Sequence, residues 1–241
     1  MHIIIPIWFY GFDSAMYMIC SMIGFLLSFY FNKIYTLSFE KRHLYLYIGF
    51  LLLAIGFMGL GIASTYSYVS FKACMRVCNL GLIDDVFSVE DFAYFAYFGF
   101  SIAAYIMFLQ AYRMMRLNLT NVFVFALLAY LLMIVLFMPE SRLGSIWYGY
   151  SGYFHFTSLL ILSYITFKNA VNYDEKKSVN SLLVVNAFAF LSMSHMLHLF
   201  SFVSGLVYVL AHIFMLIGFG SLLIMVVKIV RGCSVPDFSG G

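Results

Sequence analysis

The sequence has few charged residues, few cysteines and no region that reads as an independent soluble domain. Of its 241 residues, only 10% are Asp, Glu, Lys or Arg, whereas a soluble domain has about 25%. The four cysteines are too few and too scattered to form a disulfide framework. These absences exclude a water-soluble enzyme, a nucleic-acid-binding domain, a disordered regulator and a disulfide-rich secreted module.

Familiar catalytic and cofactor motifs are absent as well. The chain contains no P-loop, no G-x-S-x-G and no H-E-x-x-H sequence. The last hydrophobic segment has no lysine near its middle, because Lys228 lies close to its end, and this argues against a retinal Schiff base. Charged residues inside the hydrophobic segments are too few for a typical proton pump or ion-coupled transporter.

Hydrophobic residues dominate instead. They make up 64% of the chain, aromatic residues alone make up 20%, and the mean hydropathy is +0.99. A water-soluble globule could not bury 28 Phe, 19 Tyr and 15 Met together. The composition therefore predicts an integral membrane protein whose main partner is the lipid bilayer.

Seven segments are long and apolar enough to cross a bilayer, which takes roughly 20 mostly apolar residues in a helix. The alternating pattern of a membrane β-barrel is absent. We predict an all-α bundle of seven transmembrane helices that forms a single domain over residues 1–241, with a short tail at 232–241. The predicted spans are 8–31, 44–68, 92–112, 119–138, 147–167, 181–203 and 206–230.

The basic residues predict the orientation, because cytoplasmic loops are rich in Lys and Arg. Of the 13 basic residues, 10 fall on one side of the predicted spans and 3 on the other. We therefore predict a multi-pass protein of the cell membrane with its N-terminus outside and its C-terminus inside. The inner set is Lys33, Lys41, Arg42, Arg113, Arg116, Lys168, Lys176, Lys177, Lys228 and Arg231, and the outer set is Lys72, Arg76 and Arg142.

Four of the six histidines lie within the predicted spans, where ionisable groups are costly and indicate function by default. His195 and His212 flank the turn at 203–205, and a rise of about 1.5 Å per residue places both roughly 10–12 Å from it. His198 shares a helix face with His195, and His155 is early in the fifth span. All four are therefore expected at a similar depth in the outer half of the membrane.

Imidazoles gathered at one depth suit a bound cofactor. Neutral imidazole is a ligand for Zn and Cu, and a pair of histidines in a helix bundle can hold haem b. We predict cofactor binding by His155, His195, His198 and His212. For a metal ion, the predicted ligands are His195, His198 and His212 with Asp13, a carboxylate at the outer end of the first span. Hydrogen bonding between helices is the alternative role for each histidine.

Three functions remain open at this stage. The first is redox, metal-handling or membrane-hydrolase chemistry at the histidine cluster. The second is a receptor-like or sensory module that signals through a separate cytoplasmic partner. The third is an accessory subunit of a larger membrane complex. Whether the protein is an enzyme stays undecided among these three.

Two further patterns indicate packing rather than chemistry. Gly59-x-x-x-Ala63 in the second span presents small residues that let helices approach closely. The tyrosines near the span ends are typical of an interfacial aromatic belt. We expect no further role for either group.

Overall fold

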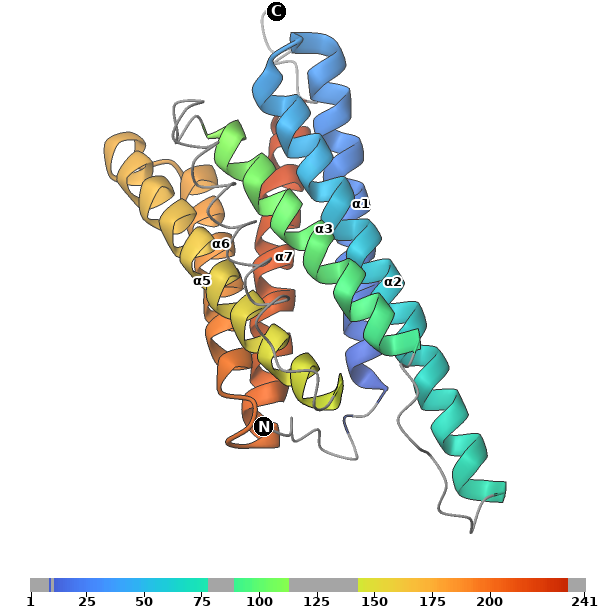
Figure 1. Cartoon of the computed structure of the whole chain (residues 1–241). Coiled ribbons are helices and arrows are strands. Elements are labelled where there is room, and N and C mark those ends of the chain that lie inside the picture. Colours follow the sequence, from blue (N-terminus) through green and yellow to red (C-terminus); the bar gives the residue numbers. More distant parts are fainter. Residues whose placement is uncertain (1–8, 10, 78–88, 113–142, 234–241) are drawn as a thin grey trace, which may run out of the picture.

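The described structure is a bundle of long helices. The computed structural model describes residues 9, 11–77, 89–112 and 143–233, and within these ranges it has six helices and no strand (Figure 1). The all-α prediction is therefore confirmed for this part of the chain. The helices are α1 (Phe12–Ser38), α2 (Lys41–Val77), α3 (Val89–Ala111), α5 (Leu143–Lys176), α6 (Val179–Leu199) and α7 (Gly205–Cys233).

Five of these helices are long and apolar enough to cross a membrane, namely α1, α2, α3, α6 and α7. The chain is thus a multi-pass membrane protein by length and composition. The predicted fourth span, 119–138, lies outside the described residues, as does most of the predicted tail. The total of seven spans and the outward N-terminus remain predictions.

Local backbone features set where the helices begin and end. α1 starts after Gly11, whose φ of 98° is left-handed. It ends at Ser38, and the next residue, Phe39, caps it by donating its N–H to the Tyr35 carbonyl. Ser178 caps α6 by accepting the Ser181 N–H. α6 ends at Leu199 and not at 203, because a series of turns follows although its residues are apolar.

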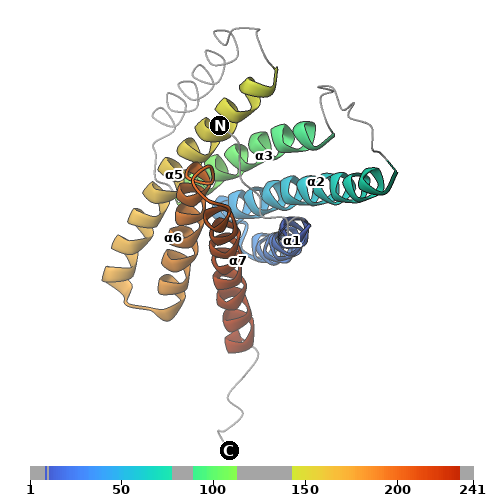
Figure 2. The ribbon, with the colours of Figure 1, turned by 90° about the horizontal axis from the view of Figure 1, so that it is seen from below.

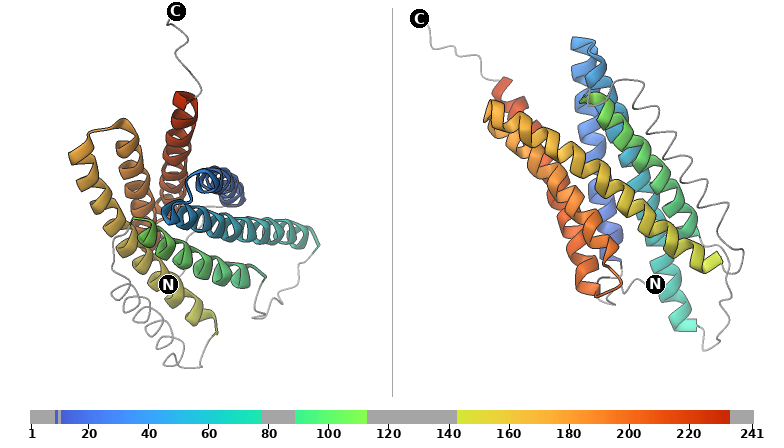
Figure 3. Two further views of the ribbon diagram at one scale, coloured as in Figure 1. Left: turned by 90° about the horizontal axis from the view of Figure 1, so that it is seen from above. Right: turned by 60° about the vertical axis from the view of Figure 1, so that its left-hand side comes forward.

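The helices follow one another around the bundle (Figures 2 and 3). α1, α2 and α3 pack in sequence, as do α5, α6 and α7, and the ring is closed by contacts of α7 with α1 and of α3 with α5. We call the end where α1 starts the N-terminal end. The opposite end, where Lys33, Lys41 and Lys168 lie, is called the basic end.

Three serines fasten α1 to α2 at a regular spacing. Ser14, Ser21 and Ser28 donate hydrogen bonds to the carbonyls of Gly61, Ala54 and Tyr47, at 2.9, 2.8 and 3.3 Å. Both sets are spaced by seven residues, as expected for antiparallel helices that stay in contact over several turns. Serine hydroxyls therefore join α1 to α2 beside aromatic pairs such as Phe31 and Phe50.

The predicted packing face Gly59-x-x-x-Ala63 has another environment. No atom lies within 4 Å of the position that a Cβ on Gly59 would take. Gly59 and Ala63 instead line an apolar groove of about 510 Å³ between α2 and α3. The glycines that permit close contact are others on α2, above all Gly49, which lies against the ring of Phe108.

Aromatic side chains fill the half of the bundle nearer the basic end. Phe108 and Phe188 are fully or almost fully buried, and their ring centroids are 5.8 Å apart. The ring of Phe50 lies 4.8 Å from that of Phe108. This closely packed core fixes the positions of the helices on the side of the histidines that faces the basic end.

Candidate functional site

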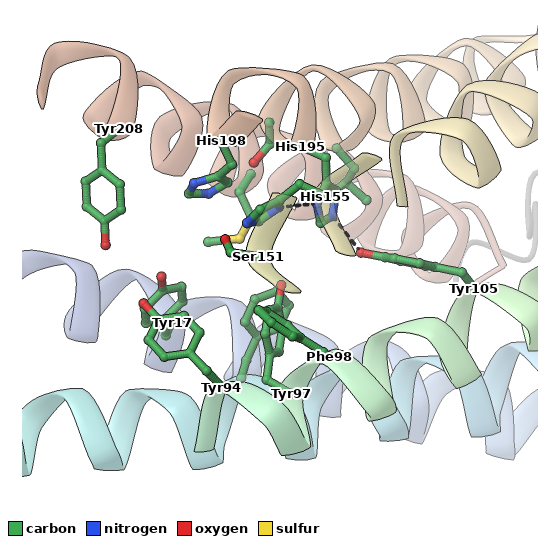
Figure 4. A pocket seen from close by; sticks show the side chains of 14 residues that line it. Tyr17, Tyr94, Tyr97, Phe98, Tyr105, Ser151, His155, His195, His198 and Tyr208 are labelled. Carbon is green, nitrogen blue, oxygen red and sulfur yellow. Dashed lines mark hydrogen bonds between the residues drawn. The ribbon is translucent and has the colours of Figure 1, made fainter. Parts of the chain in front are cut away.

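A small polar cavity lies inside the bundle toward the N-terminal end (Figure 4). Its volume is about 40 Å³, and all six described helices contribute to its lining. Five tyrosines, three histidines and two serines line it together with four apolar side chains. Such a concentration of hydroxyl and imidazole groups inside a membrane bundle is the strongest indication of a functional site in the described residues.

The periodicity of the helices brings the histidines together. His195 and His198 are three residues apart on α6 and therefore share one face. α5 and α7 pack on either side of α6, so that His155 and His212 reach the same region. The structure thus brings the four histidines together, with centroids of neighbouring rings 4.7 to 5.2 Å apart. Their common depth in a membrane stays a prediction.

The part of the cluster nearer the basic end is a hydrogen-bonded chain of three side chains. The Tyr105 hydroxyl lies 2.9 Å from Nε2 of His195, and Nδ1 of His195 lies 2.9 Å from Nδ1 of His155. Figure 4 shows the three side chains in a row along the cavity. His195 is buried, and both of its ring nitrogens are used in this chain.

Two arrangements of hydrogens satisfy this chain equally. A neutral imidazole donates from one nitrogen and accepts at the other. When His155 Nδ1 donates to His195, His195 Nε2 donates to the Tyr105 oxygen. When His195 Nδ1 donates to His155, the Tyr105 hydroxyl donates to His195 Nε2. The positions of the heavy atoms therefore do not distinguish the two arrangements.

His212 belongs to a second hydrogen-bonded group, nearer the N-terminal end. Its side chain is completely buried. Its Nδ1 lies 2.9 Å from the Tyr208 carbonyl oxygen, to which it donates, and its Nε2 lies 2.9 Å from the Tyr17 hydroxyl. With Nδ1 protonated, Nε2 accepts the Tyr17 hydrogen, so this ring is held in one tautomer.

Asp13 closes this second group at the start of α1. It is 4% exposed, and its Oδ1 accepts the N–H groups of Gly11 and Ser14 at 3.1 and 2.8 Å. The Tyr208 hydroxyl donates to its Oδ2 at 3.4 Å. Asp13 therefore lies near the cluster as predicted, but it acts through Tyr208 and the α1 backbone.

His198 lies between the two groups and differs from the other histidines. Its ring stacks on that of His155, with centroids 4.7 Å apart and planes inclined by 18°. It meets the ring of His212 edge-on at 5.0 Å. The carbonyl of His198 accepts the Ser201 hydroxyl, but its imidazole ring makes no hydrogen bond with another described residue, and the residue is only partly buried.

Among the described residues, no three His, Cys, Asp or Glu side chains are arranged as a metal-binding group. His195 and His212, two predicted ligands, use both ring nitrogens for other hydrogen bonds. The metal-ligand role of His195, His198, His212 and Asp13 stays a prediction. The four histidines thus form two kinds of pair. His195 and His212 are hydrogen-bonded to tyrosines, whereas the rings of His155 and His198 stack on each other beside the cavity.

Five tyrosines at the cavity were missed in the sequence analysis. Tyr17, Tyr94, Tyr97, Tyr105 and Tyr208 line the cavity, and two of them bind histidines directly. Sequence spacing carried a signal of this, because Tyr17 follows Asp13 by four residues and His212 follows Tyr208 by four. Tyrosine is also common at the membrane interface. Assigning tyrosines to an interfacial belt therefore left this four-residue spacing unnoticed.

Comparison with known proteins does not add to this description. The chain matches no protein family, no curated protein and no solved structure. The function is therefore argued from the site itself.

Proposed function

We propose that the protein is a membrane-embedded proton sensor, in which the histidine cavity takes up protons that arrive from the outer side. The observation that carries this proposal is the stacked, mutually unbonded pair His155 and His198. Imidazole is the side chain whose ordinary titration falls between about pH 5 and 8. Two neutral rings stack without penalty, whereas two imidazolium charges about 5 Å apart repel by on the order of 3 kcal/mol at an effective dielectric constant of about 20.

Hydroxyl groups surround the pair. α3 contributes Tyr105 and α7 contributes Tyr208, both of which can donate or accept a hydrogen bond. Asp13 of α1 is the nearby carboxylate, and it is joined to the cluster through Tyr208. No Lys or Arg is among the described residues that line the cavity. A proton taken up here therefore meets hydroxyl groups, other imidazoles and one carboxylate.

The packing beneath the cavity favours sensing over conduction. The hydrogen-bonded chain ends at Tyr105, and the next turn of α3 places the fully buried Phe108 below it, in contact with Phe188. In the described part of the chain, the hydrogen-bonded chain from His155 thus ends at Tyr105, one turn before this aromatic contact. A change of charge would act by moving α5 against α6 and α7, as protonated histidines do in known switches. The signal would pass to a separate cytoplasmic partner at the basic end.

A bound transition-metal ion is the second candidate, in keeping with a role in metal handling. His155 and His198 each have a ring nitrogen without a hydrogen bond to another described residue, and imidazole suits Zn and Cu. The cavity of about 40 Å³ matches one ion or a few water molecules. It is far smaller than the roughly 300–1,000 Å³ of cofactor pockets, so a metal ion is favoured over haem.

The deciding experiment measures helix movement against pH. Spin labels at Val171→Cys on α5 and Val230→Cys on α7, two exposed positions near the basic end, are introduced with the native cysteines replaced by alanine. In lipid nanodiscs, the distance between the labels should shift by about 1–2 Å between pH 8 and pH 5. His198→Phe, which keeps the stack but removes the titrating group, should abolish the shift.

His43→Gln is the matched control, because His43 lies outside the cavity and contacts Ser38 and Glu40 near the basic end. This variant should keep the full response. A shift that survives in His198→Phe, or no shift in the unmodified protein, would contradict the sensor. Elemental analysis and an absorption spectrum of the same samples test the alternative, because stoichiometric Zn or Cu that is lost in His198→Phe would identify a metal site.

A further inference from the structure

The apolar groove between α2 and α3 has the size of a ligand site. Its volume is about 510 Å³, and its lining runs from Ile55 to Tyr66 on α2 and from Phe92 to Phe100 on α3. This volume falls within the roughly 300–1,000 Å³ of ligand pockets. Among the described residues that line the groove, the hydroxyl of Tyr66 is the only polar side-chain group. A ligand for this groove is therefore apolar along almost its whole length.

Small residues leave the space between the two helices open. No atom lies within 4 Å of the position that a Cβ on Gly59 would take. Ala63 on α2 and Ala93 and Ala96 on α3 line the same groove. A longer side chain at these positions would occupy the space that these residues leave free.

The groove extends over one half of the bilayer. The segments of α2 and α3 that are long and apolar enough to cross a membrane are Lys41–Tyr66 and Phe92–Ala111, so the groove begins where both segments reach the N-terminal end. A rise of about 1.5 Å per residue gives roughly 16 Å from Tyr66 to Ile55. The hydrocarbon core of a bilayer is about 30 Å thick. The length of the groove therefore matches the depth of a single leaflet.

The groove is continuous with the surface that contacts the bilayer. Met58, Ile62 and Phe92 line it and are also exposed on the outside of the bundle. An empty groove at this depth would deprive its walls of dispersion contacts. The bilayer supplies a partner with the required chemistry and length at this surface, namely a lipid acyl chain.

We propose that the groove binds one acyl chain of a phospholipid from the leaflet at the N-terminal end. The chain enters beside Tyr66, a residue type that favours the headgroup level, and it ends near Ile55. The groove also shares a wall with the histidine cavity. Gly56 lines the groove, and a Cβ there would lie 3.2 Å from the ring of Tyr97, which lines the cavity. The bound chain therefore packs against the helices that hold the cavity, whatever the cavity binds.

Lipid retention tests this site. The protein is purified from its membrane in a mild detergent, and the phospholipid that stays bound is quantified by mass spectrometry. Gly59→Leu places a side chain in the groove, so it should reduce the retained lipid about tenfold relative to the unmodified protein, since both cannot fit. Gly220→Leu on α7 is the matched control, because a Cβ on Gly220 also has no atom within 4 Å. This variant should retain the full amount.

Equal retention in Gly59→Leu and Gly220→Leu would overturn the proposal. So would an absence of retained lipid from the unmodified protein, which would mean that a second copy or another segment of the chain covers the groove. Both results are independent of pH, so they would remove the lipid site and not the proton sensor.

Photolabelling of the unmodified protein decides the matter if Gly59→Leu does not fold. A phospholipid with a diazirine in the half of its acyl chain nearer the headgroup is incorporated into nanodiscs, and the labelled residues are identified by mass spectrometry. Ala63 is 4% exposed and lines the groove, so it should be labelled. Ala54 on the same helix is fully buried against Gly24 of α1 and should not be. Labelling of neither alanine, or of both equally, would overturn the proposal.

Discussion

The two halves of the bundle are built from the same helices but have different side-chain interactions: hydrogen bonds in one half and aromatic packing in the other. Toward the N-terminal end, α3, α6 and α7 contribute Tyr105, His195 and His212, which are joined to other side chains by hydrogen bonds. About two turns further toward the basic end, helices α6 and α7 contribute Phe188 and Phe219, whose rings pack on those of Phe108 and Phe57. The mean hydropathy of a whole helix does not show this difference. The position of each polar side chain along the helix does.

This contrast explains how a polar site is kept in a membrane protein. Hydrogen bonds between helices in a bilayer contribute modestly, about 0.6 kcal/mol on average, and so cannot by themselves hold a bundle together. The aromatic core supplies the contacts that fix the positions of the helices, and the cavity then keeps its small volume. Substitutions in the two halves should therefore differ in kind, with large losses of stability in one and losses of response in the other.

Truncation in the core should have the largest effect. Phe108 is fully buried against Phe50 and Phe188, and Phe108→Ala should lower the free energy of unfolding by about 3–5 kcal/mol because it leaves a cavity. Steric trapping in bicelles measures this quantity. The control Phe29→Ala, at a position that is 71% exposed, should change it by less than about 0.5 kcal/mol. Equal effects would show that the basic half is not a packed core.

Much of this arrangement could be predicted from the sequence, since helix periodicity and depth are simple arithmetic. The positions of His195 and His212 on either side of the α6–α7 turn follow from the rise per residue, and the structure brings these rings near His198. The sequence predicts that the sixth span ends at 203, beyond the end of α6 at Leu199. The turn residues are mostly apolar, and hydropathy does not distinguish an apolar turn from a helix.

The partners of the histidines could not be predicted in the same way. Which hydroxyl meets which ring depends on the rotation of each helix about its axis, and composition does not determine that rotation. Tyr105 lies 90 residues from His195, and Tyr17 lies 195 residues from His212. The tautomers and the small size of the cavity follow from these long-range pairs.

Adding a methyl group should affect stability differently at two glycine positions on α2. A Cβ on Gly49 would lie 2.5 Å from a ring carbon of Phe108 and 3.3 Å from the Ala104 carbonyl oxygen. Gly49→Ala should therefore destabilise the bundle by about 1–3 kcal/mol through overpacking. Gly59→Ala faces open space and should be neutral or stabilising by up to about 1 kcal/mol, because alanine favours the helix. The same unfolding measurement compares them, and a loss of stability in both would contradict the open groove.

Removal of one hydroxyl from the cavity should lower stability less than truncation in the core, and it should have the clearest effect on hydrogen bonding. Tyr105→Phe keeps the ring but leaves Nε2 of His195 without its partner, which should cost about 1–2 kcal/mol. His195 would then choose its tautomer through His155 alone, so its ¹⁵N chemical shifts should change in protein labelled at histidine. Tyr66→Phe, at a position that is 62% exposed, should leave those shifts unchanged. Unaltered His195 signals in Tyr105→Phe would mean that the hydrogen-bonded chain from Tyr105 to His155 does not set the tautomer of His195. The two halves of the bundle would then differ in their side-chain packing and not in a hydrogen-bonded chain that controls the imidazoles.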